Sequence, residues 1–233
     1  MSEQRRLLVV GATGLTGSLA IRIGNEREMF RMMALARREF PIERGTRLEV
    51  LVADPKNWRQ AVREMAPDAV LCAVGSTWHK SGRDEDAFRA VDYDLVLEIA
   101  HGAKEGEVNN FVLISSAGAN KMSKNFYLRV KGETEDEVQK LRLPRLDILR
   151  PGLLLGKRTN DFRAGEGMAR LFSPLADMVL RGARSELRSI KAETVAEAAL
   201  QLASEKARGR FIHDNDAIQR AAKRFNYDHT VGQ

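Results

Sequence analysis

Tyr127 and Lys131 stand four residues apart in NFYLRVKGETEDEVQKL (residues 125–141), a stretch with the polar and apolar spacing of an amphipathic helix. At positions i and i+4 of a helix, two side chains meet on one face, with Cβ atoms roughly 5–6 Å apart. An ammonium group beside a phenol favours the phenolate and lowers the tyrosine pKa from about 10 toward neutrality. Such a tyrosine could act as a general acid or base. Taken alone, the pair could equally be a surface aromatic beside a surface lysine.

Two serines end the strand-like run before this helix. FVLISSAGAN (residues 111–120) places Ser115 and Ser116 at its end, and Ser116 precedes Tyr127 by eleven residues. Open α/β sheets bind ligands at the carboxyl ends of their strands. A hydroxyl there could hydrogen-bond a substrate carbonyl or alcohol while the tyrosine transfers a proton. Satisfying backbone groups at the strand end is the alternative, and it fits Ser115 better than Ser116.

Near the start of the chain, a strand-like run leads into a glycine-rich turn, GATGLTGSLAIRI (residues 11–23). Its glycines have the spacing G-x-x-G-x-x-G and open a helix-like segment. Such a turn lets backbone approach a pyrophosphate, and the amides at the helix start meet the phosphate charge. In this context the pattern favours dinucleotide binding over a simple glycine turn. The cofactor contacts expected here come from Gly11, Thr13, Gly14, Leu15, Thr16 and Gly17.

The position twenty residues past Gly17 normally carries an acid in NAD-binding chains, because a carboxylate accepts a hydrogen bond from the ribose 2′-hydroxyl. Here it is Arg37, followed by Arg38. A guanidinium group would pair with a 2′-phosphate, so NADP(H) is favoured over NAD(H). Glu39 is the nearest acid and leaves NAD(H) open. A solvated loop charge is the alternative reading of Arg37.

Asp54 follows a third strand-like run and directly precedes Pro55. An aspartate before a proline at the first helical position is typical of a helix N-cap, so we expect Asp54 to cap the next helix. A hydrogen bond to the cofactor's adenine would be an addition to that role.

The chain up to Pro151 alternates short apolar runs with longer helix-like segments. The runs are apolar on both faces, as in buried parallel strands, and cover residues 5–10, 30–36, 47–53, 69–74, 110–115 and 145–150. The helix-like segments lie near residues 15–28, 55–66, 84–105 and 123–141. Repeated β-α order predicts an α/β fold with a doubly wound parallel sheet, the Rossmann fold.

We expect a single domain over residues 1–233 with a small C-terminal lobe on the substrate side. A helix near 192–206, a strand at 209–213 and a last helix at about 214–225 are predicted after the looser stretch 152–183. The substrate-side elements should lie mainly in residues 152–190 and 209–233.

Composition agrees with a folded globular protein, at 43% hydrophobic and 30% charged residues. The net charge of 38 − 32 = +6 is scattered, which indicates no nucleic-acid surface and suits a small anionic ligand.

Cys72 stands alone in the apolar run DAVLCAV and should be a buried, unreactive thiol. No apolar run approaches the roughly 18 residues of a membrane span, and the histidines lack metal-ligand spacing. We therefore expect a cytoplasmic monomer or homodimer without a metal site.

In this order and spacing, the glycine turn, ISSAG, Y-x-x-x-K and LRPG resemble the short-chain dehydrogenase/reductase superfamily, in its atypical NAD(P)-binding branch. More narrowly, SSAGANKMSKNFYLRVKGETEDEVQKLRLPRLDILRPGLLLG is similar to the Tat-interacting-protein oxidoreductases and their bacterial relatives, often labelled nucleoside-diphosphate-sugar epimerase-like. The resemblance covers nearly the whole chain.

The resemblance implies a role for each matching position. Ser116 would orient the substrate oxygen and Tyr127 would be the general acid/base. Lys131 would bind the hydroxyls of the nicotinamide ribose and lower the tyrosine's pKa. The cofactor would also be lined by Ala73, Val74 and Gly75, and approached near the nicotinamide by Pro151 and Gly152.

One position departs from the family pattern. Many members have an asparagine in the helix before the fifth strand, which supports a proton relay, whereas FRAVDYDLVLEIA offers Asp92. An aspartate has no amide donor, so either the relay differs or Asp92 is a charge on the helix surface. The acidic run GETEDEVQK (residues 132–140) likewise looks like a solvated helix face.

These features predict an NADP(H)-dependent oxidoreductase that transfers hydride to or from a small carbonyl or alcohol. Sugar-nucleotide epimerases would use the same three polar residues but need a larger substrate lobe, and only 233 − 151 = 82 residues follow position 151. The alternative from another class is an NADP(H)-binding regulatory or assembly protein with little or no turnover.

Overall fold

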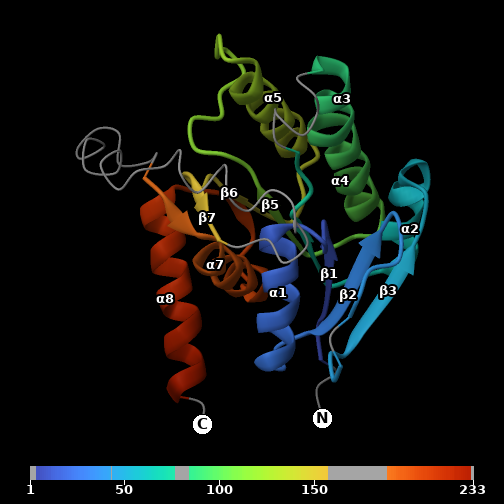
Figure 1. Ribbon diagram of the computed structural model, residues 1–233, viewed down its shortest axis with the longest axis vertical. Helices are drawn as coiled ribbons and strands as arrows, with labels where there is room; N and C mark the ends of the chain where they lie inside the picture. The colour runs from blue at the N-terminus through green and yellow to red at the C-terminus, as the bar shows by residue number, and fades with distance from the viewer. Residues whose placement is uncertain (1–3, 43, 77–83, 157–187, 232–233) are drawn as a thin grey trace.

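The computed structural model describes residues 4–42, 44–76, 84–156 and 188–231, and within them a seven-stranded parallel sheet forms the centre (Figure 1). The strand order is β3-β2-β1-β4-β5-β6-β9, and every neighbouring pair is parallel. The strands are β1 (Arg6–Val10), β2 (Arg31–Ala36), β3 (Leu48–Val52), β4 (Ala69–Cys72), β5 (Asn110–Ile114), β6 (Arg145–Leu149) and β9 (Gly209–His213). The predicted doubly wound α/β fold is confirmed.

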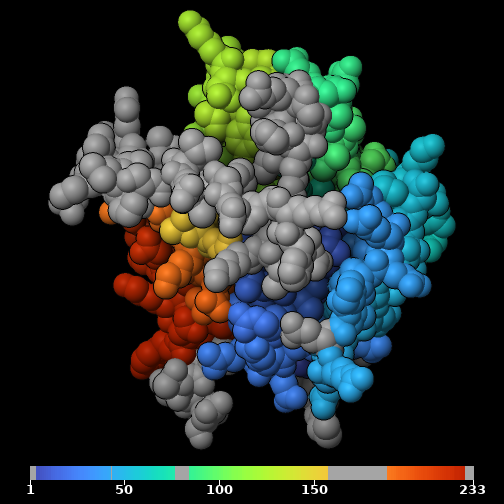
Figure 2. Space-filling view, in the orientation of Figure 1, coloured from blue at the N-terminus to red at the C-terminus, as the bar shows by residue number. Residues whose placement is uncertain are grey.

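Helices cover both faces of this sheet. One face packs against α1 (Leu15–Glu26), α7 (Ala192–Ser204) and α8 (Asn215–Val231); the other packs against α2 (Trp58–Met65), α4 (Leu95–Glu105) and α5 (Phe126–Lys140). Each inner strand therefore buries both faces, which explains the continuous apolar runs in the sequence. In Figure 2 the blue N-terminal and red C-terminal segments share one face of the molecule, and α1 contacts α7.

A π-helical turn interrupts the helix that the sequence predicts over residues 84–105. The segment begins as α3 (Glu85–Arg89), passes through the turn η2 (Ala90–Asp94) and continues as α4. Asp84 caps its start by accepting hydrogen bonds from the amides of Asp86 and Ala87. A π turn widens the helix by one residue and so changes which side chains face inward.

The end of the chain differs in part from the predicted substrate-side lobe. β9 extends the main sheet beside β6, and α8 packs against α7, so much of residues 209–233 belongs to the scaffold. β7 (Leu154–Leu155) and β8 (Ile190–Lys191) form a separate two-stranded parallel pair. Most of the predicted stretch 152–183, and His79, fall outside the described residues. Among the described helices, none has the length and apolar character to cross a membrane.

Candidate functional site

The glycine turn after β1 is shaped by close backbone contacts. Gly11 has φ +93°, in the left-handed region, and a Cβ there would lie 2.5 Å from the carbonyl oxygen of Ala73. A Cβ on Gly17 would lie 2.3 Å from the carbonyl oxygen of Gly11. The start of α1 therefore rests directly on the turn, and side chains at these two positions would separate them.

The start of α1 has the properties of an anion-binding site. Gly14 is its N-cap residue, and among the described residues no side chain caps the first amides. The helix dipole places partial positive charge there, and its first turn contains no acidic residue. Thr13 is exposed, Leu15 is half-buried and lies near Gly156, and Thr16 is buried. These residues lie where the sequence predicts a pyrophosphate.

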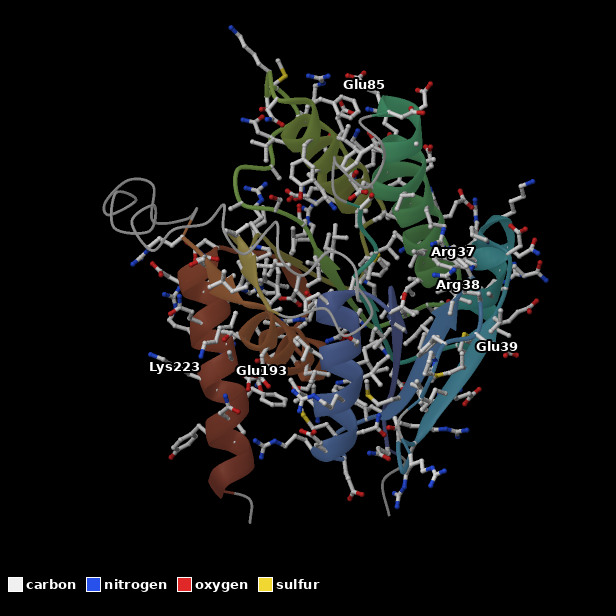
Figure 3. All side chains as sticks on the ribbon, viewed as in Figure 1. Arg37, Arg38, Glu39, Glu85, Glu193 and Lys223 are labelled. Carbon is white, nitrogen blue, oxygen red and sulfur yellow. The ribbon has the colours of Figure 1, made fainter. Side chains whose placement is uncertain are left out.

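Arg37 and Arg38 are exposed at the carboxyl end of β2 (Figure 3). This is the same edge of the sheet at which the glycine turn follows β1. Asp54 follows the neighbouring strand β3, where its Oδ1 accepts a hydrogen bond of 2.9 Å from the amide of Lys56. Asp54 is thus the N-cap of the short 3-10 helix η1 (Pro55–Asn57), so the predicted capping role is confirmed.

The segments that follow β4, β5 and β6 meet at this edge. Ala73 to Gly75 leave β4 immediately after its last residue. Beyond β5, the amide of Ser115 donates to the carbonyl of Leu149, and the amide of Ala117 donates to that of Pro151, both at 2.8 Å. The amide of Gly152 donates to Oδ1 of Asn215 at 2.9 Å. Backbone hydrogen bonds thus fix the predicted nicotinamide end of the site.

Tyr127 lies in the first turn of α5, which Asn125 caps through a hydrogen bond from the amide of Leu128. Its ring is half-buried and packs against the fully buried Phe88 of α3, with ring centroids 5.5 Å apart. The tyrosine therefore is not a freely solvated surface aromatic. Ser116 is half-buried beyond β5, and its hydroxyl lies 3.3 Å from the carbonyl oxygen of Ala117.

Lys131, one turn further along α5, is buried beside Asp92 of η2. Nζ of Lys131 lies 2.7 Å from Oδ1 of Asp92, which is 0% exposed. A Cβ on Gly75 would lie 3.3 Å from that oxygen and 3.5 Å from Nζ, so the ion pair borders the segment after β4. Burial disfavours the ammonium, but the carboxylate of Asp92, with a contribution from Tyr127, raises the pKa of Lys131 above its ordinary value.

A second ion pair fixes α5 to the ends of β5 and β6. Glu135, one turn beyond Lys131 and 2% exposed, is held by the guanidinium of Arg150. The hydroxyl of Ser115 also donates to Glu135. The expectation that Ser115 would satisfy backbone groups at the strand end is not met, because its hydroxyl donates to this carboxylate, whereas the hydroxyl of Ser116 lies against the backbone carbonyl of Ala117.

The sequence left two alternatives open for Asp92. The structure excludes the charge on the helix surface, because the π turn and the opposing α5 bury Asp92. The acidic run 132–140 is not uniformly solvated, since Glu135 faces the sheet edge. The spacing Tyr127, Lys131, Glu135 repeats every four residues and could have indicated that all three share one helix face.

Cys72 ends β4 beneath this site and is completely buried, as expected. Burial raises the pKa of its thiol to about 12. Within the described residues, His, Cys, Asp and Glu side chains form no group of three that could hold a metal ion.

Comparison with known sequences gives a consistent result. A family model described as NAD(P)H-binding matches residues 11–206. Protein FMP52, mitochondrial, of Debaryomyces hansenii is 34% identical over 203 residues, which cover 84% of this chain and 87% of that protein. The Saccharomyces cerevisiae protein of the same name is 38% identical over 163 residues, 69% of this chain and 70% of that one. Protein HTATIP2 of Rattus norvegicus is 35% identical over 178 residues, which cover 73% of this chain and 71% of that protein.

Solved structures share the fold. A putative NAD-dependent epimerase/dehydratase from Bacillus halodurans superposes with a TM-score of 0.66 at 21% identity, over 94% of this chain and 99% of that one. The Bordetella bronchiseptica enzyme WbmH in complex with NAD+ superposes with a TM-score of 0.68 at 16% identity, over 91% of this chain and 76% of that one. At these identities the likeness concerns the fold.

The predicted cytoplasmic location is contradicted by these relatives, because the yeast proteins are named mitochondrial. A lone buried cysteine and the lack of a membrane-length apolar run do not distinguish one aqueous compartment of a cell from another. Composition therefore could not support that prediction.

Proposed function

Because this chain belongs to the NAD(P)H-binding family, within the atypical branch of the short-chain dehydrogenase/reductase superfamily that its sequence resembles, we propose that it is an NADP(H)-dependent oxidoreductase. Its substrate is a small carbonyl compound or the corresponding alcohol. The observation that carries the proposal is the half-buried Tyr127, one helical turn from a buried, ion-paired Lys131 at the carboxyl edge of the sheet.

The residues present fit a dinucleotide. Gly11 and Gly17 have no Cβ to collide with the neighbouring backbone, and the first amides of α1, which no side chain of the described residues caps, suit a pyrophosphate. The segment Ala73–Gly75 and Pro151–Gly152 would line the nicotinamide end. When bound, the nicotinamide supplies or accepts the hydride.

The chain's own side chains would handle the proton and the substrate oxygen. The Ser116 hydroxyl would donate a hydrogen bond to the substrate oxygen and hold it beside Tyr127. The Tyr127 hydroxyl would give its proton to that oxygen in reduction and take it back in oxidation. The Lys131 ammonium would hold the nicotinamide ribose hydroxyls by donating hydrogen bonds to them.

NADP(H) is proposed over NAD(H) because Arg37 and Arg38 lie exposed at the end of β2, where the ribose 2′-position is expected. A 2′-phosphate would gain charge-assisted hydrogen bonds there. Glu39 follows them and is the acid that an NAD(H) site would use instead.

The experiment is a turnover assay with NADPH and a panel of aldehydes, ketones and quinones. Tyr127→Phe removes the proton donor but keeps the ring that packs on Phe88, so kcat should fall by about 10²–10⁴-fold while NADPH affinity stays within about twofold. Tyr227→Phe is the matched control, because Tyr227 is 68% exposed on α8, and it should leave both quantities unchanged. Equal activity in wild type and Tyr127→Phe would contradict the proposal. NADPH binding without turnover on any substrate would favour the regulatory alternative.

A further inference from the structure

The carboxylate of Asp92 contacts two elements of the candidate site at once. Its Oδ1 lies 2.7 Å from Nζ of Lys131, and its Oδ2 accepts a hydrogen bond of 2.7 Å from the amide of Ser76. Ser76 directly follows the segment Ala73–Gly75, which leads out of β4. One buried side chain thus connects the proposed catalytic lysine to the segment proposed to line the cofactor.

Local backbone contacts hold Asp92 in this position. It lies in the middle of the π turn η2, and its own carbonyl accepts a hydrogen bond of 2.9 Å from the hydroxyl of Thr134 on α5. The same hydroxyl reaches the carbonyl of Val130. Single π turns inside α-helices are rare, and they are found frequently at functional sites. Here the turn directs a carboxylate between α5 and the end of β4.

The buried charges of Asp92 and Lys131 balance each other. Oδ1 of Asp92 accepts no aligned hydrogen bond from the described residues, so the ammonium of Lys131 is what compensates it. Within the described part of the chain, the other titratable groups acting on Lys131 are Tyr127 on the same helix and Cys72 of β4. Since a buried charge without a partner is strongly disfavoured, the carboxylate of Asp92 favours the charged form of Lys131.

We propose that Asp92 is a positioning residue. Its carboxylate holds the Lys131 ammonium in a fixed position beside the segment Ala73–Gly75. This role deepens the proposed function, on which its effect on turnover rests. An asparagine could keep only one of these two contacts. Its amide has a single accepting oxygen, so its NH₂ group would face either the ammonium of Lys131 or the amide of Ser76.

The first test measures Lys131 and requires no turnover. The protein is produced with lysine that carries ¹³C at Cε, and the Lys131 signal, assigned with Lys131→Met, is titrated by NMR. In wild type it should titrate above the ordinary lysine range, while the exposed Lys223 of α8 serves as the internal reference (Figure 3). In Asp92→Asn the Lys131 midpoint should fall by at least one pH unit, because burial then acts on an uncompensated ammonium.

The matched control is Asp147→Asn. Asp147 is also 0% exposed and ion-paired, at 2.6 Å from Nε of Arg145, but strand alternation places it on the face of β6 opposite to α5. The Lys131 titration should be the same in this variant as in wild type. Identical midpoints in wild type, Asp92→Asn and Asp147→Asn would overturn the proposal.

The second test uses kinetics with NADPH. In Asp92→Asn, kcat should fall at least tenfold and the alkaline limit of the pH profile should move to lower pH, whereas a purely structural role would leave the profile of the folded fraction unchanged. If the wild-type protein has no turnover, the proposed oxidoreductase function fails, while the titration still decides the role of Asp92.

If Asp92→Asn does not fold, the titration of the wild-type protein decides. A Lys131 midpoint equal to that of Lys223 would overturn the proposal, and a Lys131 midpoint above that of Lys223 would support it.

Discussion

Arg150 holds the carboxylate of Glu135 on both oxygens: Nε lies 3.1 Å from Oε1 and from Oε2, and Nη2 lies 2.5 Å from Oε2. The pair joins the middle of α5 to the residue that follows β6. Because Tyr127 and Lys131 lie earlier on the same helix, this contact fixes the helix that carries both proposed catalytic groups. Its contribution to stability can be measured separately from any effect on catalysis.

Removing one member of that pair should destabilise the fold. Glu135→Ala leaves the guanidinium of Arg150 and the hydroxyl of Ser115 without their carboxylate, so the free energy of unfolding should fall by about 1.5–3 kcal/mol in urea denaturation. Glu137→Ala on the same helix is the control. It breaks an exposed pair with Lys140 and should cost at most about 1 kcal/mol. Equal losses of unfolding free energy in Glu135→Ala and Glu137→Ala would contradict the expectation that the buried pair contributes more to stability than the exposed one.

A methyl group on Gly17 should weaken cofactor binding. Its Cβ would lie 2.3 Å from the carbonyl oxygen of Gly11, so α1 must move away from the glycine turn. We expect the Kd for NADPH, measured by fluorescence titration, to rise at least tenfold in Gly17→Ala. Gly24→Ala in the same helix is the control, because its Cβ would meet only the flexible ends of Met32 and Leu200. An unchanged Kd in Gly17→Ala would contradict the proposed pyrophosphate site.

Cofactor preference should depend on the end of β2. The double variant Arg37→Ala, Arg38→Ala removes two exposed guanidinium groups, and a hydrogen bond to a charged group contributes about 1.5–3 kcal/mol. The Kd for NADPH should therefore rise on the order of 10–100-fold, while the Kd for NADH stays unchanged. Arg31→Ala, at the exposed amino end of the same strand, should alter neither. Tighter binding of NADH than NADPH by the wild-type protein would refute the assignment.

The Cys72 thiol should make the fold sensitive to alkali. Burial raises its pKa to about 12 from an ordinary value of 9.0, so above pH 9.0 the unfolded chain releases a proton that the folded chain retains. The stabilisation is complete below pH 9.0 and is lost as the pH rises toward 12. One such proton lowers the free energy of unfolding by up to about 1.4 kcal/mol per pH unit.

Cys72→Ala separates this contribution from the others. Urea denaturation between pH 9.0 and pH 10 should give a flatter pH dependence in the variant than in wild type, because the lysines and tyrosines that also titrate there are the same in both proteins. Between pH 6 and pH 8 the two should show parallel pH dependence despite the variant's lower stability. Equal slopes above pH 9.0 would mean that the native thiol ionises normally.

Much of the scaffold could be predicted from the sequence because its signals are local. Strands buried on both faces require continuous apolar runs, and the runs at residues 5–10 and 145–150 became β1 and β6 with little change in bounds. The glycine turn was predictable because a positive φ at Gly11 and a close contact at Gly17 allow few other residues. The cap at Asp54 likewise depends on only the next two residues.

The sequence could not place side chains whose burial depends on a distant element. For Asp92 it left a surface charge open as one of two alternatives, because helical periodicity assumes 3.6 residues per turn and the π turn breaks that period at this residue. Glu135 appeared to continue a solvated acidic run because its partner, Arg150, is fifteen residues away and belongs to another element.

The sequence by itself determined the order of strands and helices, the dinucleotide turn, and the spacing of Tyr127 and Lys131, because each depends on neighbouring residues and on backbone preference. Only the tertiary structure decided that β9 completes the sheet beside β6, and that Lys131 is buried against Asp92 rather than solvated. The physical reason is that burial and charge pairing depend on which elements pack together. Whether an aspartate is solvated or holds a buried lysine is set by the element opposite it in space, and local sequence does not specify that element.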